Sequence, residues 1–261
     1  MLIKLALAPC LVWQGLQVRR RALRLPEAEG ARVGWAWPTA AWPAAGASAE
    51  AALAGSGRAG ASKRLLVVGD SSAAGVGVPH QSQALAAPLA RALARHLGQP
   101  VGWQLLATTG HTAADALRSV VQAELQPADW LVTALGVNDV VGQTGVPVFL
   151  SQLQALHELA VARAGVRCTF HSALPPMAQF PLLPQPLRWV LGRDARRLDQ
   201  ALQAEVAHWP DRCHVPLPAL PKGPLPAGWL AEDGFHPGPL GYPAWVARLA
   251  QAVLAREASS G

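Results

Sequence analysis

Residues 64–75 read RLLVVGDSSAAG, in which four consecutive aliphatic residues are followed at once by glycine, aspartate and serine. An apolar run of this length, bounded by Arg64 and Gly69, is typical of a strand that is buried on both faces of a sheet. The glycines allow a tight turn out of such a strand, so Ser71 is expected where the chain leaves the sheet. This placement makes Ser71 a candidate nucleophile, although the same position also suits an ordinary turn or helix N-cap serine.

Downstream of this strand, apolar runs and helical patterns alternate along the chain. The sequence predicts helices over residues 81–97, 113–124, 146–164, 186–208 and 239–256, and further strands at 101–107, 130–135, 166–171 and 213–215. Parallel neighbouring strands need crossover connections, and single helices of this length supply them. We therefore expect a three-layer α/β/α sandwich with a five-stranded parallel sheet.

The chain divides by composition into two parts. Residues 63–258 carry the alternating pattern and form the predicted domain, whereas residues 1–62 precede it. Within that first part, residues 34–62 are rich in alanine, glycine, proline and serine and have no sustained period, which indicates a linker or extension.

The first residues need a separate interpretation, because Lys4 precedes a largely apolar stretch that ends in three consecutive arginines, Arg19 to Arg21. The stretch is too short to predict a membrane span, and it lacks the small-residue cleavage site of a secretory signal. Three interpretations stay open: an interfacial or anchoring helix that makes peripheral membrane contact through residues 2–24, an uncleaved export signal, and a helix packed on the domain. The location is correspondingly open between cytoplasmic, membrane-associated and exported.

Charge and cysteine usage exclude some classes of function. The net charge is +6, but no basic surface interleaved with aromatic residues and no reading motif is visible, so we expect no nucleic-acid partner. The three cysteines, Cys10, Cys168 and Cys213, are far apart and lack the spacing of a zinc site or of a disulfide framework.

Further chemistry-bearing residues follow other predicted strands. Gly110 lies in the segment TTGHT after the second strand, and Asn138 lies in GVND after the third. A glycine amide and an asparagine side chain are suitable donors to the negative oxygen of a tetrahedral intermediate. Near the end of the chain, Asp233 stands three positions before His236, so one turn can bring the carboxylate to one ring nitrogen while the other faces Ser71. Each residue taken alone is more often a turn, cap or structural residue.

Together the four segments change that balance, because ligands of such folds bind outside the carboxyl ends of the strands. Gly-Asp-Ser, the later glycine, Gly-x-Asn-Asp and Asp-x-x-His stand in this order at predicted strand ends. The pattern resembles the SGNH hydrolase family, also called GDSL, whose four blocks match Ser71, Gly110, Asn138 and His236. The resemblance implies a flavodoxin-like domain, esterase or lipase activity without metal or cofactor, and an oxyanion hole formed by the Ser71 amide, the Gly110 amide and the Asn138 side chain.

The chain departs from the family pattern at two places. Many relatives carry an asparagine shortly before the glycine of the second block, whereas Ala107, Thr108 and Thr109 stand here, so the sequence does not show which group supports this loop. The residue after the nucleophile is Ser72 instead of leucine, and only the register of the Gly-Asp-Ser block favours Ser71 as the nucleophile.

The sequence predicts a serine esterase that cleaves a small-molecule ester through an acyl-enzyme, with Ser71, Asp233 and His236 as its triad. One alternative is an acyltransferase or carbohydrate deacetylase with the same triad, and another is a non-enzymatic flavodoxin-like binding module. The proline-rich segment 175–184 is expected beside the site, either as an apolar wall for the acyl group or merely as a cover of the sheet end. Acyl length and oligomeric state are not determined by the sequence.

Overall fold

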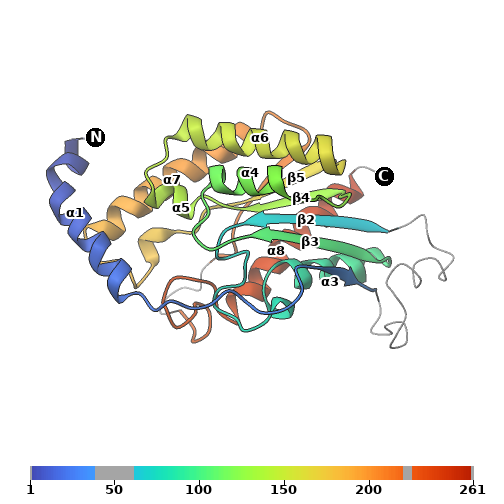
Figure 1. Ribbon diagram of the computed structural model, residues 1–261, viewed down its shortest axis with the longest axis horizontal. Coiled ribbons are helices and arrows are strands. Elements are labelled where there is room, and N and C mark those ends of the chain that lie inside the picture. The colour runs from blue at the N-terminus through green and yellow to red at the C-terminus, as the bar shows by residue number, and fades with distance from the viewer. Residues whose placement is uncertain (1, 39–61, 220–224, 260–261) are drawn as a thin grey trace.

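The structure, a computed structural model, describes residues 2–38, 62–219 and 225–259 (Figure 1). Its strands are β1 (Val33–Ala36), β2 (Lys63–Gly69), β3 (Val101–Ala107), β4 (Trp130–Ala134), β5 (Cys168–Ser172) and β6 (Arg212–Val215). Its α-helices are α1 (Leu2–Arg21), α3 (Ala86–Leu97), α4 (Ala113–Gln122), α5 (Val137–Val141), α6 (Val146–Ala164), α7 (Leu187–Val206) and α8 (Gly241–Ala258). Two 3₁₀ turns, η1 (Gln81–Gln83) and η2 (Met177–Gln179), complete the described elements.

The strands form one sheet in the order β1-β3-β2-β4-β5-β6. Strands β2 to β6 are parallel to their neighbours, and β1 runs antiparallel to β3 at the edge. The predicted α/β sheet with five parallel strands is thus confirmed, and the whole sheet has one strand more than predicted, because β1 adds an antiparallel sixth strand at the edge.

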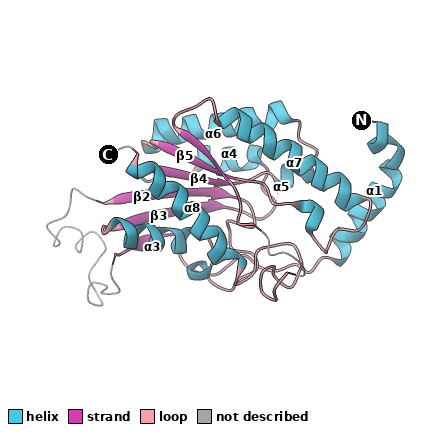
Figure 2. Ribbon diagram, turned by 180° about the vertical axis from the view of Figure 1, so that it is seen from behind, coloured by secondary structure: helices cyan, strands magenta, loops and turns pink. Residues whose placement is uncertain are grey.

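Helices cover both faces of the sheet, as the alternation of side chains in β2 shows. Leu65 and Val67 belong to the buried cluster that also contains the apolar side chains of α3 and α8. Leu66 and Val68 point to the other face, into a cluster with α4, α6 and α7. Figures 1 and 2 show these two helical layers on opposite sides of the strands. All four residues are almost completely buried, so the predicted two-sided burial of this strand is correct.

Strand β1 begins at Val33, and its other three residues, Gly34 to Ala36, lie in the predicted linker, residues 34–62. Two glycine positions explain how it fits: a Cβ on Gly34 would lie 3.1 Å from the Trp103 ring, and one on Gly102 would lie 3.2 Å from the Trp35 ring. Each indole therefore covers a glycine of the neighbouring strand. A strand of four residues held by such cross-strand contacts has too little apolar alternation of its own to be recognised. Residues 39–61 of the predicted linker lie outside the described residues.

The helix predicted over residues 81–97 is interrupted near its beginning. Residues 81–83 form the separate turn η1, and α3 starts only at residue 86. The buried Gln81 side chain explains the break, because its amide nitrogen donates to the carbonyl oxygens of Ala28 at 3.1 Å and Ala74 at 2.8 Å. These hydrogen bonds to distant residues compete with a continuous helix at this place. They cannot be predicted from the spacing of apolar residues along the helix.

Helix α1 packs on α7 in the described structure. The Gln14 side chain donates to the Gln185 carbonyl at 2.6 Å and accepts from the Leu187 amide at 3.0 Å. Nearer the start of α1, Lys4 forms an ion pair of 2.5 Å with Asp194 of α7. Among the helices of the described residues, none combines the length and apolar character that a membrane crossing requires.

Candidate active site

Three of the predicted site loops leave the sheet side by side. Gly69, the last residue of β2, pairs with Ala107 of β3 on one side and with Ala134 of β4 on the other. The segments that carry Ser71, Gly110 and Asn138 follow these three positions directly, and Asn138 lies in the short helix α5. The carboxyl ends of adjacent parallel strands thus bring together segments that are distant along the chain.

Ser71 lies in a tight turn that begins where β2 ends. The turn is closed by backbone hydrogen bonds from Ala74 to the Asp70 carbonyl at 2.9 Å and from Val76 to the Ser71 carbonyl at 3.0 Å. Gly75 takes φ = 88°, a conformation that favours glycine. The turn therefore fixes the Ser71 backbone, and its side chain is largely buried beside the sheet end.

The imidazole of His236 bridges Ser71 and Asp233. Its Nε2 lies 2.8 Å from the Ser71 Oγ, and its Nδ1 lies 2.5 Å from Asp233 Oδ2. The second carboxylate oxygen of Asp233 accepts from the backbone amides of Phe235 at 2.9 Å and His236 at 3.0 Å. A proton on Nδ1 facing the carboxylate leaves Nε2 free to accept from the serine hydroxyl. The structure thus joins the three predicted residues in one chain of hydrogen bonds.

Asp233 is held in its ionised form. Burial raises the pKa of this carboxyl, but the hydrogen bonds from the His236 ring and from the backbone amides of His236 and Phe235 outweigh it. The pKa of Asp233 therefore lies below its usual value. A carboxylate at this place accepts a charge-assisted hydrogen bond from a proton on Nδ1 of His236.

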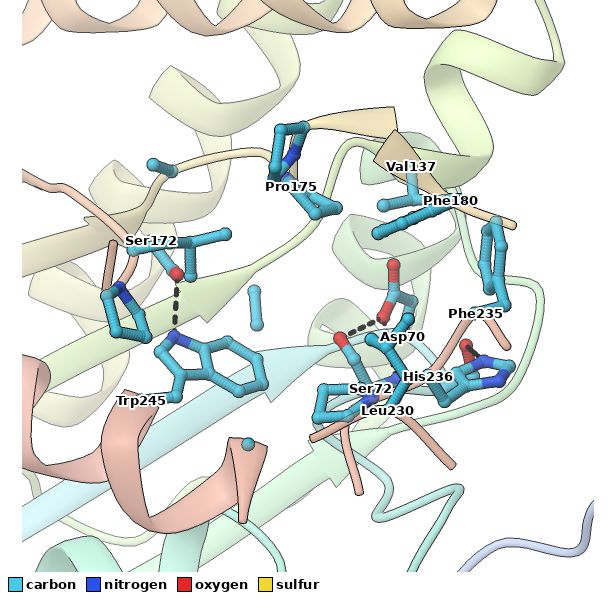
Figure 3. A pocket seen from close by; sticks show the side chains of 18 of the residues that line it. Asp70, Ser72, Val137, Ser172, Pro175, Phe180, Leu230, Phe235, His236 and Trp245 are labelled. Atoms are coloured by element: carbon cyan, nitrogen blue, oxygen red, sulfur yellow. Dashed lines mark hydrogen bonds between the residues drawn. The ribbon is translucent and has the colours of Figure 1, made fainter. Parts of the chain in front are cut away.

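Ser72, the rival nucleophile, points to a different partner. Its hydroxyl donates to Asp70 Oδ1 at 2.7 Å, and its backbone amide donates to the same oxygen at 2.9 Å (Figure 3). Burial raises the pKa of Asp70, although the hydrogen bonds from Ser72 act in the opposite direction. Of the two adjacent serines, Ser71 is the one that contacts His236.

The structure ties the Asn138 side chain to the loop of Gly110. Asn138 Nδ2 donates to the carbonyl oxygen of His111 at 3.0 Å, and Asp139 Oδ2 accepts from the Ala113 amide at 2.9 Å. Gly110 itself is exposed and takes φ = 88°. Since a carboxamide nitrogen has two N–H groups, one remains for another acceptor. The oxyanion roles of Gly110 and Asn138 stay predictions.

An apolar cavity of about 120 Å³ opens beside Ser71 and His236. Its walls include Phe180, Phe235 and Trp245, and Figure 3 shows His236 and Phe235 on one side of it and Trp245 on the other. The proline-rich segment predicted beside the site contributes Pro175 and Pro176, together with Phe180, to the wall. This segment therefore lines the cavity and does not merely cover the sheet end.

Tyr242 is a supporting residue that sequence reasoning missed. Its hydroxyl lies 2.8 Å from the carbonyl oxygens of both Ser72 and Val76, and the ring is fully buried at the start of α8. The Tyr242 hydroxyl thus stabilises the turn of Ser71 by hydrogen bonds to two of its carbonyl groups. In the sequence it differs in nothing from an ordinary aromatic core residue at the beginning of a helix.

Gly77, in the loop that follows Ser71, lies directly against the loop that carries His236. It takes φ = 107°, and a Cβ there would lie 2.2 Å from the carbonyl oxygen of Pro237. We expect Gly77→Ala to destabilise the protein by about 1–3 kcal/mol in denaturant unfolding, because strain and a backbone clash act together. Gly98→Ala is the matched control, since Gly98 also has a positive φ but nothing within 4 Å of its Cβ. Equal losses in both variants would contradict the close contact.

No group of three or more histidine, cysteine or acidic side chains suited to a metal ion occurs in the part of the chain that the structure describes. Cys10, Cys168 and Cys213 are free thiols.

Comparison with known proteins places this geometry in context. Three similar solved structures are TesA (19% identity, 74% of this chain and 99% of that chain, TM-score 0.56), the psychrotrophic esterase EstA from Pseudoalteromonas sp. (17%, 74% and 97%, 0.54) and the lipase Lip_vut3 from a goat rumen metagenome (18%, 73% and 97%, 0.55). At these identities the likeness shows a shared fold. A search of curated proteins found no match.

Sequence comparison with protein families gives the more specific result. The model of the GDSL-like lipase/acylhydrolase family matches residues 67–244, which is more than half of the chain and contains all four of the predicted blocks. The resemblance drawn from the four blocks is thereby confirmed. The chain belongs to the GDSL-like lipase/acylhydrolase family of hydrolases.

Proposed function

We propose that the protein is a serine esterase that hydrolyses carboxylic esters through an acyl-enzyme on Ser71. The observation that carries this proposal is the continuous chain of hydrogen bonds from Ser71 Oγ through His236 to Asp233, at the edge of an apolar cavity. A hydroxyl within 2.8 Å of a neutral imidazole nitrogen can lose its proton as it attacks a carbonyl. The apolar walls suit the acyl part of an ester better than a charged substrate.

The first half of the reaction forms the acyl-enzyme. His236 Nε2 takes the proton of Ser71 as the oxygen attacks the ester carbonyl, and the electron pair of the C=O bond moves to the carbonyl oxygen. The amides of Ser71 and Gly110 and the side chain of Asn138 donate to this oxyanion. When the intermediate collapses, the imidazolium gives its proton to the departing alcohol.

The second half restores the enzyme. A water molecule in place of the alcohol gives a proton to His236 and attacks the acyl carbonyl, and the same donors hold the second oxyanion. The C–O bond to Ser71 then breaks, the serine regains its proton from His236, and the carboxylic acid leaves. Asp233 keeps its charge throughout and stabilises the imidazolium in both halves.

Asn138→Ala tests the oxyanion role directly. We expect kcat to fall by about 10²- to 10³-fold with little change in KM, because the amide acts on the charge that develops in the transition state. Steady-state kinetics on a chromogenic short-chain ester measure both constants. A rise in KM with unchanged kcat would instead assign Asn138 to ground-state binding.

Labelling with a fluorophosphonate probe tests the whole proposal. Such a probe forms a stable phosphonyl ester only with an activated serine, so we expect one modified peptide, carrying the probe on Ser71. Peptide mass spectrometry of the labelled protein identifies the residue. Labelling that persists in Ser71→Ala, or an unlabelled wild-type protein, would refute the serine mechanism.

A further inference from the structure

A short segment ahead of the family match, residues 27–32, lies against two of the active-site loops. The Ala28 amide donates to the Ala74 carbonyl at 3.2 Å, and the Glu29 amide donates to the Pro79 carbonyl at 2.9 Å. Both acceptors belong to the loop that begins with the Ser71 turn. The segment thus borders the nucleophile loop although it lies about forty residues earlier in the chain.

The same segment holds the loop of Gly110 by two side chains. Glu27 Oε1 accepts from the backbone amide of Thr109 at 2.6 Å, and Arg32 Nη1 donates to the carbonyl of Ala107 at 2.5 Å. The two side chains also pair with each other at 2.5 Å. Two successive peptides just before Gly110, Ala107–Thr108 and Thr108–Thr109, are therefore bonded to one ion pair.

After Gly110, the loop is also held by Asn138, which donates to the His111 carbonyl at 3.0 Å. Around the Cα of Gly110 there is open space, since a Cβ there would meet nothing within 4 Å. The backbone bonds near it are long, at 3.4 Å from Thr108 to the Gly69 carbonyl and 3.2 Å from His111 to the Thr108 carbonyl. This is also the loop in which the chain lacks the asparagine that many relatives carry. The bond from Glu27 to the Thr109 amide supports this loop from a distant segment of the chain.

We propose that Glu27, oriented by Arg32, is a positioning residue that keeps the Gly110 amide directed at the oxyanion. This inference rests on the proposed function, because it assumes that the Gly110 amide is an oxyanion donor. A donor stabilises the transition state only when its direction is fixed before the reaction, and a displacement of about 1 Å can cost about 10²-fold in rate. Glu27 touches no substrate and acts through the loop.

The ionisation of Glu27 is consistent with this role. Burial raises the pKa of this carboxyl, but the hydrogen bond from the Thr109 amide and the charge of Arg32 outweigh it, so the pKa lies below its usual value. The carboxylate therefore stays charged at neutral pH, and a charged acceptor makes a stronger hydrogen bond to an amide than a neutral one does.

The test compares Glu27→Ala with Glu29→Ala. Glu29 is exposed, lies two residues away and carries the same charge, so its variant controls for the change of charge in this segment. We expect kcat for a chromogenic ester to fall by about 10- to 10²-fold in Glu27→Ala, with KM changed less than about twofold, and to stay near wild type in Glu29→Ala. Glu27→Gln keeps an oxygen acceptor for the Thr109 amide and should restore most of kcat.

Several outcomes would overturn the positioning role. They are equal kcat values in Glu27→Ala and Glu29→Ala, a parallel rise of KM that accounts for the loss, and no recovery in Glu27→Gln. If Glu27→Ala does not fold, Glu27→Met, which keeps the length of the side chain without an oxygen, takes its place. Failure of both to fold would assign Glu27 to the fold and overturn the inference.

The design separates this inference from the proposed function. Fluorophosphonate labelling of Ser71 in the wild-type protein tests the serine mechanism alone. Labelled wild-type protein with an unaffected Glu27→Ala refutes only the positioning role. Unlabelled wild-type protein refutes the mechanism itself, whatever the Glu27 variants do.

A second, independent observation concerns the outward face of α1. Opposite the face that packs on α7, the helix exposes Val12, Trp13 and Leu16, with 63%, 59% and 49% of their surfaces accessible. Residues three and four apart share one face of a helix, so Val12 and Leu16 lie in line, with Trp13 beside them. Large side chains exposed together in this way indicate contact with an apolar phase.

Positive charge continues this surface at the end of the helix. Arg19, Arg20 and Arg21 form its last turn and are exposed, as is Arg24 shortly after it. Residues 2–26 contain no aspartate or glutamate. An apolar strip next to uncompensated arginines is typical of a helix that lies in the headgroup region of an anionic bilayer.

The helix also lies at the catalytic end of the molecule. Figures 1 and 2 both show α1 beyond the edge of the sheet at which the carboxyl ends of the strands lie. It contacts α7 at Leu187, a few residues after Phe180, which lines the cavity. A surface that docks through α1 would therefore lie at the same end as Ser71.

We infer that α1 docks this protein on a lipid bilayer that contains anionic lipids. A protein partner fits less well, because a stable interface buries roughly 800 Å² on each side and three exposed apolar side chains supply only part of that area. A bilayer interface needs no such area, since shallow insertion and several arginines act together. The inference does not depend on the serine mechanism.

Vesicle binding tests it with the full chain. We expect the protein to cosediment with vesicles of phosphatidylcholine and phosphatidylglycerol, and far less with phosphatidylcholine alone or at high ionic strength. Replacing Arg19, Arg20 and Arg21 together by glutamine should weaken binding about 10²-fold, and Trp13→Gln about tenfold.

Two control variants match these changes elsewhere on the surface. Glutamine at Arg95, Arg118 and Arg167, which are exposed outside α1, removes the same charge, and Trp209→Gln removes an exposed indole beyond the far end of α7. Both should bind like wild type. Absence of cosedimentation with anionic vesicles, or equal losses in the control and α1 variants, would overturn the inference.

Discussion

Ser71→Ala should lower kcat for ester hydrolysis by about 10⁶-fold, to the level that the remaining groups of the site support without a nucleophile. The reason is geometric: the Ser71 Oγ lies 2.8 Å from His236 Nε2, and in the variant the imidazole has no hydroxyl to activate. Water can still attack slowly, because the oxyanion donors and the cavity remain. Steady-state kinetics measure the ratio of the two kcat values. The wild-type and variant proteins are expressed separately and purified on separate columns, so that neither contaminates the other.

Ser72→Ala is the matched control, because it removes the same hydroxyl from the adjacent residue. The Ser72 hydroxyl donates to Asp70 and does not contact the imidazole, so we expect kcat to stay within about tenfold of wild type. Any smaller loss of kcat would arise because the buried Asp70 carboxyl loses the hydrogen bond from Ser72 and the turn shifts. An inactive Ser72→Ala together with an active Ser71→Ala would move the nucleophile by one residue.

Asp233→Asn should lower kcat by about 10⁴-fold while leaving the fold intact. The asparagine oxygen can still accept from the amides of Phe235 and His236, as Asp233 Oδ1 does in the structure. Its NH₂ group then faces Nδ1 of His236, which must become the acceptor. The ring proton moves to Nε2 and points at Ser71, so the imidazole can no longer take the serine proton.

Glu232→Gln is the control for Asp233→Asn, because it removes one negative charge from the adjacent, exposed position. We expect its kcat to match wild type, and circular dichroism should show both variants folded. If Asp233→Asn kept full activity, or if Glu232→Gln lost as much, the tautomer explanation would be wrong.

The pH dependence of the free energy of unfolding tests the ionisation of Asp233 independently of activity. Its pKa is lower in the folded protein than in the unfolded chain, so its contribution to stability is present above the unfolded pKa and is lost as the pH falls through the folded pKa. Asp233→Asn should therefore flatten the acid side of a stability curve measured by denaturant unfolding. An unchanged acid limb would mean that the carboxylate gains nothing from its partners on folding.

The parallel part of the sheet follows from local patterns. Four aliphatic residues before Gly69 predict β2, and comparable runs predict β3, β4, β5 and β6 within one or two residues of their observed ends. A strand that is buried on both faces needs apolar residues at nearly every position, so its signal is contained in a few consecutive residues of the sequence. The short helix α5 and the strand β1 have no comparable signal, since contacts with other elements form them.

Some features of the site can likewise be predicted from neighbouring residues, and others depend on residues that are distant in the sequence. The spacing of Asp233 and His236 within one turn is local, and the observed hydrogen bonds of that turn agree with it. The register of the Gly-Asp-Ser block favours Ser71 over Ser72, but only the folded turn shows that the Ser71 hydroxyl contacts the His236 ring while the Ser72 hydroxyl donates to Asp70. Glu27 has no signal at all, since its partner Thr109 lies far along the chain.

By itself, the sequence determined the α/β alternation, the family and the residue types at the strand ends, because hydrophobic periodicity and short motifs depend on neighbours along the chain. The tertiary structure alone decided that α1 packs on α7, that β1 closes the edge of the sheet, and that residues 27–32 border the Ser71 and Gly110 loops. The physical reason is that hydrogen bonds such as those of Gln81 and Glu27 join groups whose distance is fixed only when the whole sheet has formed.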